Sequence, residues 1–149
     1  MSGTRLQYLN ANDWTLIGAK AVRRTYKLGE EIIGQGALLD SIFIIRRGEV
    51  AVELMAADSR ARVAKLGVGD ICGEIGFLEK GRSTAAVIAK DDEVEADEIN
   101  AAELRELFEA FPRLASRFYL SLALILAQRL KDTSRELARV MAVGKRRLD

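Results

Sequence analysis

The spacing of hydrophobic positions changes once along the chain, at its single proline, Pro112. Before Pro112, short runs with apolar residues at alternate positions are separated by glycines, a pattern typical of β-strands joined by turns. After Pro112, apolar residues recur at steps of three and four, which is typical of a long amphipathic helix. The chain is therefore predicted to be mainly β, with helices flanking the strands.

Eight strands are predicted between residues 22 and 99, and the segment 56–60 is predicted to form the tip of a hairpin. Many short strands at such close spacing indicate a jelly-roll-like β-roll, the architecture also called a double-stranded β-helix. The predicted strands are 22–26, 31–33, 42–46, 49–55, 62–66, 70–72, 85–89 and 93–99.

A short N-terminal helix is predicted at residues 10–21, because Asn12 or Asp13 can serve as its N-cap and apolar residues recur on one side. The chain length of 149 residues favours a single domain. That domain, 1–149, is predicted to consist of the helix 10–21, the β-roll 22–99 and C-terminal helices at 100–143.

The C-terminal part is predicted to form two helices, one at 101–111 after the N-cap Asn100 and one that opens at Pro112. Gly144 is predicted to end the second helix. Its apolar seam is longer than a compact roll can cover, so we expect its far end to meet a second copy in a homodimer. The seam consists of Tyr119, Leu122, Leu126, Leu130, Thr133, Leu137 and Val140.

The composition is that of an ordinary soluble protein, with 49% apolar residues, 30% charged residues and a net charge of +1. This charge predicts no bulk attraction to DNA or to an anionic membrane. The longest apolar stretch, 118–127, is shorter than the roughly 20 residues that a membrane span requires. The single cysteine and the polar start of the chain fit a cytoplasmic location.

The chain has no histidine, which removes the commonest general base and histidine-ligated metal sites. We therefore expect neither an enzyme on a cupin-like roll nor a metal or other cofactor. A non-catalytic binding module is the leading interpretation.

The segment after the sixth predicted strand carries the candidate chemistry. The glycine-rich turn 73–76 leads into a short helical segment, whose backbone N–H groups can bind a phosphate. Arg82 offers a cation with bidentate geometry for phosphate oxygens, and Glu74 offers an acceptor for sugar hydroxyls. Ser83 and Thr84 add hydroxyl donors. The alternative is a surface turn that carries an Arg–Glu ion pair.

Three segments, 27–36, 42–50 and 66–76, resemble the cyclic nucleotide-binding domain family in the order and spacing of their glycines. The family includes the bacterial catabolite activator, the regulatory subunits of protein kinase A and cyclic nucleotide-gated channels. The resemblance covers roughly residues 10–140. It implies a ligand-sensing regulatory domain that binds a cyclic nucleotide, cAMP ahead of cGMP.

The resemblance also implies roles within the phosphate-binding segment. Glu74 would hold the ribose 2′-hydroxyl, Arg82 would neutralise the cyclic phosphate, and Ser83 or Thr84 would add a hydroxyl bond. Ala85 would allow the strand to approach the ligand. The residues assigned in this way are Gly73, Glu74, Ile75, Gly76, Arg82, Ser83, Thr84 and Ala85.

One position departs from the family pattern. When Val87 is aligned with the family's strand valine, Ser83 falls where the arginine belongs and Arg82 lies one residue early. A shift by one residue in a strand turns a side chain to the opposite face. The alternative function is therefore a degenerate β-roll without a cyclic nucleotide, which acts as a dimerisation and protein-interaction module.

A further segment, 127–137, resembles the central helix of the catabolite activator, where a Thr-Ser pair contacts adenine across the dimer. Thr133 and Ser134 are the corresponding residues. The alternative is that Thr133 only sets the helix register. In the catabolite activator a DNA-binding domain follows this helix, and the five residues after Gly144 are too few for one, so no DNA-binding domain is expected.

Overall fold

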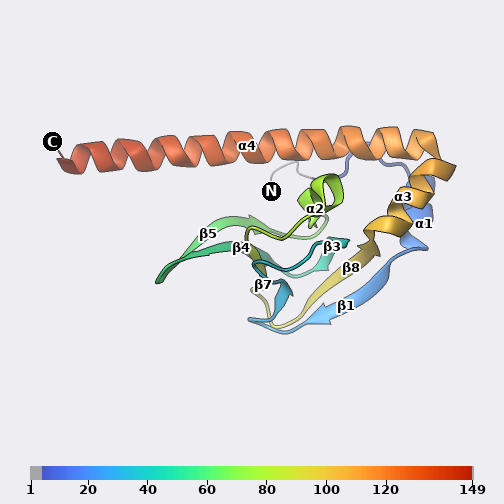
Figure 1. The fold of residues 1–149 in the computed structure, drawn as a ribbon, viewed down its shortest axis with the longest axis horizontal. Coiled ribbons are helices and arrows are strands. Elements are labelled where there is room, and N and C mark those ends of the chain that lie inside the picture. The colour runs from blue at the N-terminus through green and yellow to red at the C-terminus, as the bar shows by residue number, and fades with distance from the viewer. Residues whose placement is uncertain (1–4, 149) are drawn as a thin grey trace.

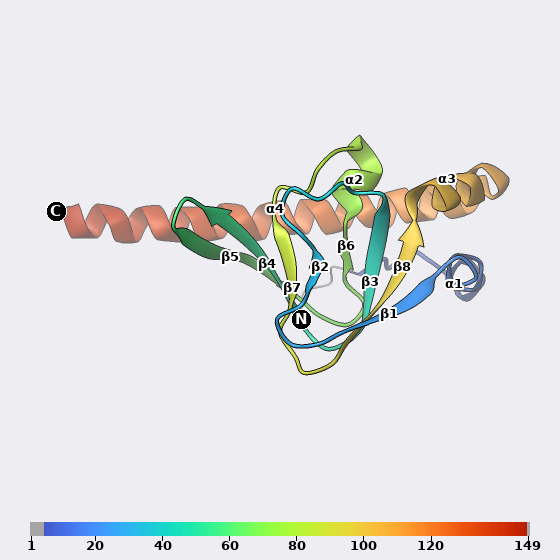
Figure 2. The ribbon, with the colours of Figure 1, turned by 60° about the horizontal axis from the view of Figure 1, so that its bottom comes forward.

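The computed structural model describes residues 5–148, and side chains through residue 145. Two four-stranded antiparallel sheets face each other and form the predicted β-roll (Figures 1 and 2). One sheet has the strand order β1-β8-β3-β6 and the other β2-β7-β4-β5. The strands are β1 (Val22–Tyr26), β2 (Glu31–Ile33), β3 (Ser41–Arg47), β4 (Val50–Ala56), β5 (Ser59–Leu66), β6 (Ile71–Cys72), β7 (Ala86–Ala89) and β8 (Val94–Asn100).

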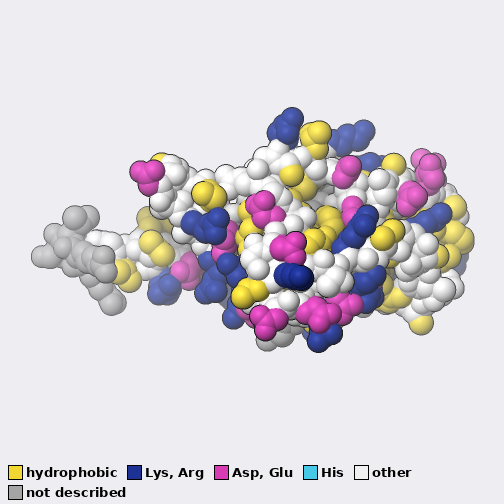
Figure 3. All heavy atoms as spheres, turned by 90° about the horizontal axis from the view of Figure 1, so that it is seen from below, with side chains coloured by type: hydrophobic (Ala, Val, Ile, Leu, Met, Phe, Trp, Pro, Cys, Tyr) yellow, Lys and Arg dark blue, Asp and Glu magenta, His cyan; other side chains and the backbone are white. Residues whose placement is uncertain are grey.

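The helices lie outside the roll, and the last of them passes over it and continues past the β4–β5 hairpin (Figure 1). The helices are α1 (Ala11–Gly18), α2 (Glu74–Glu79), α3 (Ala101–Ala110) and α4 (Pro112–Leu148). None of the helices within residues 5–148 has the length and apolar character that a bilayer span needs. Acidic and basic side chains are interspersed on the underside of the roll (Figure 3).

The alternating strands place apolar side chains on both faces of the first sheet, so the core has two layers. One layer fills the space between the two sheets and includes Phe43, Ile45 and Val94. The other layer lies between the first sheet and the helices, where Ile44 and Ile99 meet apolar side chains from α3 and α4. This second layer fixes the beginning of α4 against the roll.

The start of α1 differs from the prediction, since Asn10 is the N-cap in place of Asn12 or Asp13. Asn10 Oδ1 accepts from the Asp13 amide at 2.8 Å, and Asp13 Oδ2 accepts from the Asn10 amide at 3.0 Å. This reciprocal pair is a capping box, which needs an acidic residue at the third helical position. Only Asn10 has one. The helix is also shorter than predicted and ends at Gly18.

Two boundaries near turns also differ. β5 begins at Ser59, so the hairpin tip is tighter than the predicted 56–60, and Ala57 adopts the left-handed conformation (φ 52°) that the turn requires. Gly144 does not end α4, which continues to Leu148. A single glycine in an exposed helix costs only about 1 kcal/mol, and Lys145 favours the helix C-terminus through the helix dipole.

α4 is anchored over only part of its length. Arg117 donates to both carboxylate oxygens of the buried Asp13 in α1, at 2.6 and 2.8 Å. Phe118, Leu122 and Ile125 are buried against the roll and α3. From residue 130 to residue 145 every side chain of α4 is exposed.

Candidate functional site

A cavity of about 860 Å³ lies between the roll and α4. Its walls come from β5, the turn between β6 and α2, the segment before β7, and α4 beyond residue 128. Of the ten residues assigned to the site from the sequence, eight line this cavity and two do not. Those on the walls are Gly73, Glu74, Ile75, Arg82, Ser83, Thr84, Ala85 and Thr133.

The backbone at the start of α2 requires glycine at two positions. Gly73 has φ +83°, and a Cβ there would lie 2.7 Å from the Ser41 carbonyl oxygen. A Cβ on Gly76 would lie 2.0 Å from Leu39 Cβ. Gly76 is therefore not a wall residue. It is the point at which α2 packs closely on the loop before β3.

Glu74 is buried and already has a partner. Its Oε1 accepts from Arg129 Nη1 of α4 at 2.6 Å, and Arg129 Nη2 donates to the Ile71 carbonyl oxygen at 2.6 Å. Arg129 Nε is buried and has no hydrogen-bond partner within residues 5–148. Arg129 was not assigned from the sequence, although it lies in the segment 127–137 that resembles the catabolite activator. Arg129 thus links α4 to the β6–α2 turn, which forms the floor of the cavity.

Arg82 lies at the exposed rim of the cavity. Its Nη1 donates to the Gly36 carbonyl oxygen at 2.9 Å, and its backbone forms a bridge with Leu38. Ser83 is half-buried beside it, and its hydroxyl donates to the Ala85 carbonyl oxygen. The Arg82 guanidinium is thus held by the 34–37 loop, while Ser83 and Thr84 form the adjoining wall.

The charges on the walls suit an anionic ligand. The Glu74–Arg129 pair neutralises both of its members, and the remaining charged wall residues carry one basic side chain more than acidic ones: Arg62, Lys65 and Arg82 against Asp132 and Glu136. Burial, together with the charge of Glu74, raises the pKa of the Cys72 thiol, so this wall residue stays protonated and is a poor nucleophile. No cluster of metal-ligating side chains occurs in the described part of the chain.

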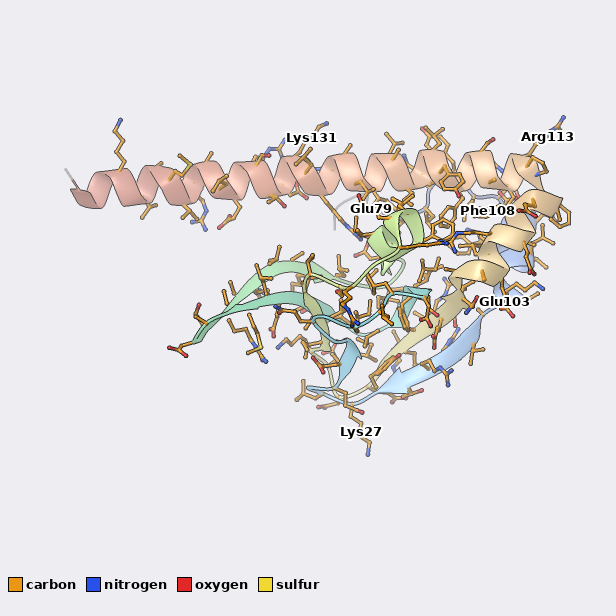
Figure 4. All side chains as sticks on the ribbon, viewed as in Figure 1. Lys27, Glu79, Glu103, Phe108, Arg113 and Lys131 are labelled. Carbon is orange, nitrogen blue, oxygen red and sulfur yellow. The ribbon has the colours of Figure 1, made fainter. Side chains whose placement is uncertain are left out.

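Thr133 and Ser134 face different directions on α4. Thr133 lines the cavity together with Leu137 and Val140, whereas Ser134 is exposed and lies outside the cavity. The predicted seam is therefore divided: Leu122 is buried in the core, Thr133, Leu137 and Val140 line the cavity, and Leu130 is exposed outside it. Lys131 points away from the roll (Figure 4).

The chain therefore combines a β-roll, a glycine-flanked turn with a short helix, and a cavity that is bounded on one side by a long C-terminal helix. The sequence profile of the cyclic nucleotide-binding domain matches residues 23–111. The chain belongs to the cyclic nucleotide-binding domain family.

Several curated proteins contain a segment similar to this chain. Cyclic GMP-binding protein C of Dictyostelium discoideum is 34% identical over 137 residues, which are 87% of this chain and 5% of that protein. Glutaminase 1 of Bradyrhizobium diazoefficiens is 34% identical over 125 residues, 84% of this chain and 20% of that protein. The cyclic AMP receptor protein of Thermus thermophilus is 32% identical over 117 residues, 77% of this chain and 51% of that protein. The chain spans about half of these relatives' length or less.

Solved structures share the fold. The c-di-GMP-responsive global regulator of Xanthomonas campestris superposes with a TM-score of 0.82 at 22% identity, over 89% of this chain and 65% of that chain. The catabolite activator protein of Thermus thermophilus superposes with a TM-score of 0.76 at 25% identity, over 93% of this chain and 63% of that chain. Both superpositions cover most of this chain, so its fold is shared with both structures.

Proposed function

We propose that the chain is a non-catalytic sensor that binds a cyclic nucleotide in the cavity beneath α4, with cAMP preferred over cGMP. The observation that carries this proposal is that Glu74, Ser83, Thr84 and Thr133 line one cavity. Relatives named for cyclic GMP binding and as a cyclic AMP receptor support the ligand class. The Thr133–Ser134 pair supports cAMP, because the corresponding pair of the catabolite activator contacts adenine.

In the proposed complex, Glu74 accepts a hydrogen bond from the ribose 2′-hydroxyl, and Arg129 holds the carboxylate in place. The free N–H groups of the first turn of α2 and the Ser83 and Thr84 hydroxyls donate to the phosphate. Arg82 turns from the Gly36 carbonyl and neutralises the phosphate from the rim.

The relay runs through α4 in this proposal. The wall residues Thr133, Leu137 and Val140 belong to the part of α4 that is exposed beyond Arg129. A ligand that contacts these residues stabilises a closed position of this part of the helix. The signal is the resulting shift in population from open to closed positions of α4. We place this function in the cytoplasm, which the single reduced cysteine supports.

Homodimerisation through α4 is part of the proposal. A row of exposed positions follows alternating steps of three and four along α4, as in a coiled-coil seam, and it meets the cavity-facing side at Leu137. Ser134 lies in this row, so in a dimer it would approach the ligand in the partner's cavity. The row consists of Leu120, Ala123, Ala127, Leu130, Ser134, Leu137 and Met141.

The test is calorimetric titration of the protein with cAMP and cGMP. We expect saturable binding below tens of micromolar, with cAMP the tighter ligand. Arg82→Ala should weaken binding at least about tenfold, because a charge-assisted phosphate contact is lost. Arg24→Ala is the control, since Arg24 pairs with Glu98 on β8, outside the cavity. No heat with either nucleotide would exclude the function, and an unchanged affinity of Arg82→Ala would remove this arginine from the site.

A second candidate is a roll that binds no cyclic nucleotide and acts as a dimerisation and interaction module. The observation that favours it is the guanidinium of Arg82, which at the exposed rim of the cavity donates to the Gly36 carbonyl oxygen. A protein that dimerises in solution and gives no heat with either nucleotide would establish this second function in place of the first.

A further inference from the structure

The short helix α2 is held by arginines at both ends. At its first residue, Glu74 pairs with Arg129 of α4. Near its other end, Arg105 Nη2 of α3 donates to the Phe77 carbonyl oxygen at 2.8 Å. The Arg105 guanidinium carbon also lies 5.0 Å from the centroid of the Phe77 ring, within range of a cation–π contact. Arg105 of α3 therefore contacts both the backbone and the side chain of Phe77 in α2.

Phe77 connects this contact to the beginning of α4. Its buried ring meets Phe108 edge-on with the centroids 6.0 Å apart, and it meets Phe118 at 5.9 Å. It also stacks with Tyr119 at 6.1 Å. Figure 4 shows Phe108 on the side of α3 that is turned toward α2 and α4. A movement of α2 would displace Phe77 and, with it, aromatic side chains from both C-terminal helices.

α2 needs an external support because little within it stabilises a helix. It has six residues, no side-chain cap at Gly73, and an end at Lys80 with a positive φ of 55°. A helix this short is unstable by itself. Its last carbonyl groups lack partners within the helix, and a cation beside them is favoured by the helix dipole. Arg105 supplies both the donor and the charge.

We infer that Arg105 is a positioning residue of the ligand site. It fixes α2 so that Glu74 and the first-turn amides face the cavity, and it ties any ligand-dependent movement of α2 to α3. Its charge at the C-terminal end of α2 complements a phosphate at the opposite end. The ligand part of this inference rests on the proposed function, whereas the support of α2 does not.

The experiment compares Arg105→Met, Arg105→Lys and the wild type. The methionine keeps an apolar stem and removes the donor and the charge, and the lysine restores a charge and one donor without the planar fork. Arg24→Met is the matched control, because it removes an arginine that pairs with Glu98 on another part of the roll. Amide hydrogen exchange is measured without ligand, and the affinity for cAMP and cGMP is measured by calorimetry.

In Arg105→Met we expect the hydrogen-bonded amides of residues 77–80 to exchange about tenfold faster, while β3 and β8 exchange at the wild-type rate. Nucleotide affinity should fall about five- to twentyfold, with Arg105→Lys intermediate and Arg24→Met unchanged. Unchanged exchange in α2, or equal acceleration across β3 and β8, would overturn the inference. If the wild type binds no nucleotide while α2 is still loosened selectively, the proposed function fails and the support of α2 by Arg105 stands.

Discussion

At the scale of single residues, two glycines determine how closely α2 approaches the roll. Gly73 combines a left-handed backbone with a separation that leaves no room for a methyl group beside the Ser41 carbonyl. Gly76 faces Leu39 so closely that any side chain would push α2 away. Gly73 is adjacent to Glu74 and Gly76 lies two residues after it, so the position of the carboxylate in the cavity depends on both glycines.

Gly73→Ala should destabilise the protein by about 2 kcal/mol, because alanine is strained at this φ and its Cβ meets backbone. The free energy of unfolding is measured by urea denaturation. Gly81→Ala is the control, since a Cβ there meets nothing within 4 Å. Equal stabilities of the two variants would show that the turn can relax and that Gly73 is not required.

Most of the residues assigned from the sequence line the cavity, but the sequence could not predict their partners. Glu74, Ser83 and Thr84 could be assigned because the turn, the short helix and the next strand are close in the chain. The contact between Glu74 and Arg129 joins residues 55 positions apart, and no local spacing indicates it. The orientation of Arg82 depends on the Gly36 carbonyl, a backbone group that any residue type would supply.

At the scale of elements, α4 has two parts with different environments. The part before residue 126 is fixed by the Asp13–Arg117 ion pair and by buried side chains such as Phe118. The part after Arg129 is exposed on every side, yet it carries apolar residues such as Leu130 and Met141. An isolated helix with such a surface is suited to pairing with another copy.

Leu130→Glu should convert a dimer into a monomer, because it places a pair of charges in the proposed seam. Sedimentation velocity at tens of micromolar protein measures the change. Arg135→Gln, which alters the charge by one unit on the opposite side of α4, should leave the dimer intact. A monomeric wild type, or a dimer that survives Leu130→Glu, would contradict pairing through this row.

The strands were easier to predict from the sequence than the ends of the helices. Along most of β8, buried and partly buried positions alternate, because successive side chains in a strand face opposite ways. The first five residues of β3 are all buried, because apolar layers cover both faces of its sheet, and they form a short apolar run in the sequence. Whether α4 ends at Gly144 depends on a free-energy cost of about 1 kcal/mol for glycine in a helix. This cost is too small for the residue type alone to predict the end of the helix. The start of α1 depended on recognising that Asn10 and Asp13 are three residues apart.

At the scale of the whole molecule, the pH dependence of stability comes from ionised carboxylates, because the chain contains no histidine. The bidentate contact with Arg117 lowers the pKa of Asp13, and the contact with Lys90 lowers the pKa of Glu53. Burial opposes ionisation of Asp97, but arginines of β1 and β3 donate to it and its pKa is also lowered. The native state thus binds fewer protons in acid than the unfolded chain does.

The urea midpoint should therefore be nearly constant between about pH 6 and pH 8, where neither carboxylates nor histidines titrate. It should fall as the pH drops from about 5 through the lowered pKa values of the folded state. Asp97→Asn should be less stable at neutral pH and less sensitive to acid than the wild type. A stability change centred near pH 6.5 would contradict this account.

The free end of α4 also has a mechanical consequence. Arg129 is the last side chain that ties the helix to the floor of the cavity, and about 28 Å of helix extend from there to Leu148. A tilt of about 10° at Arg129 would move that end by about 5 Å, if the helix stays straight. A ligand that moves the cavity wall on α4 by about 1 Å would therefore displace the far end of the helix several times as far.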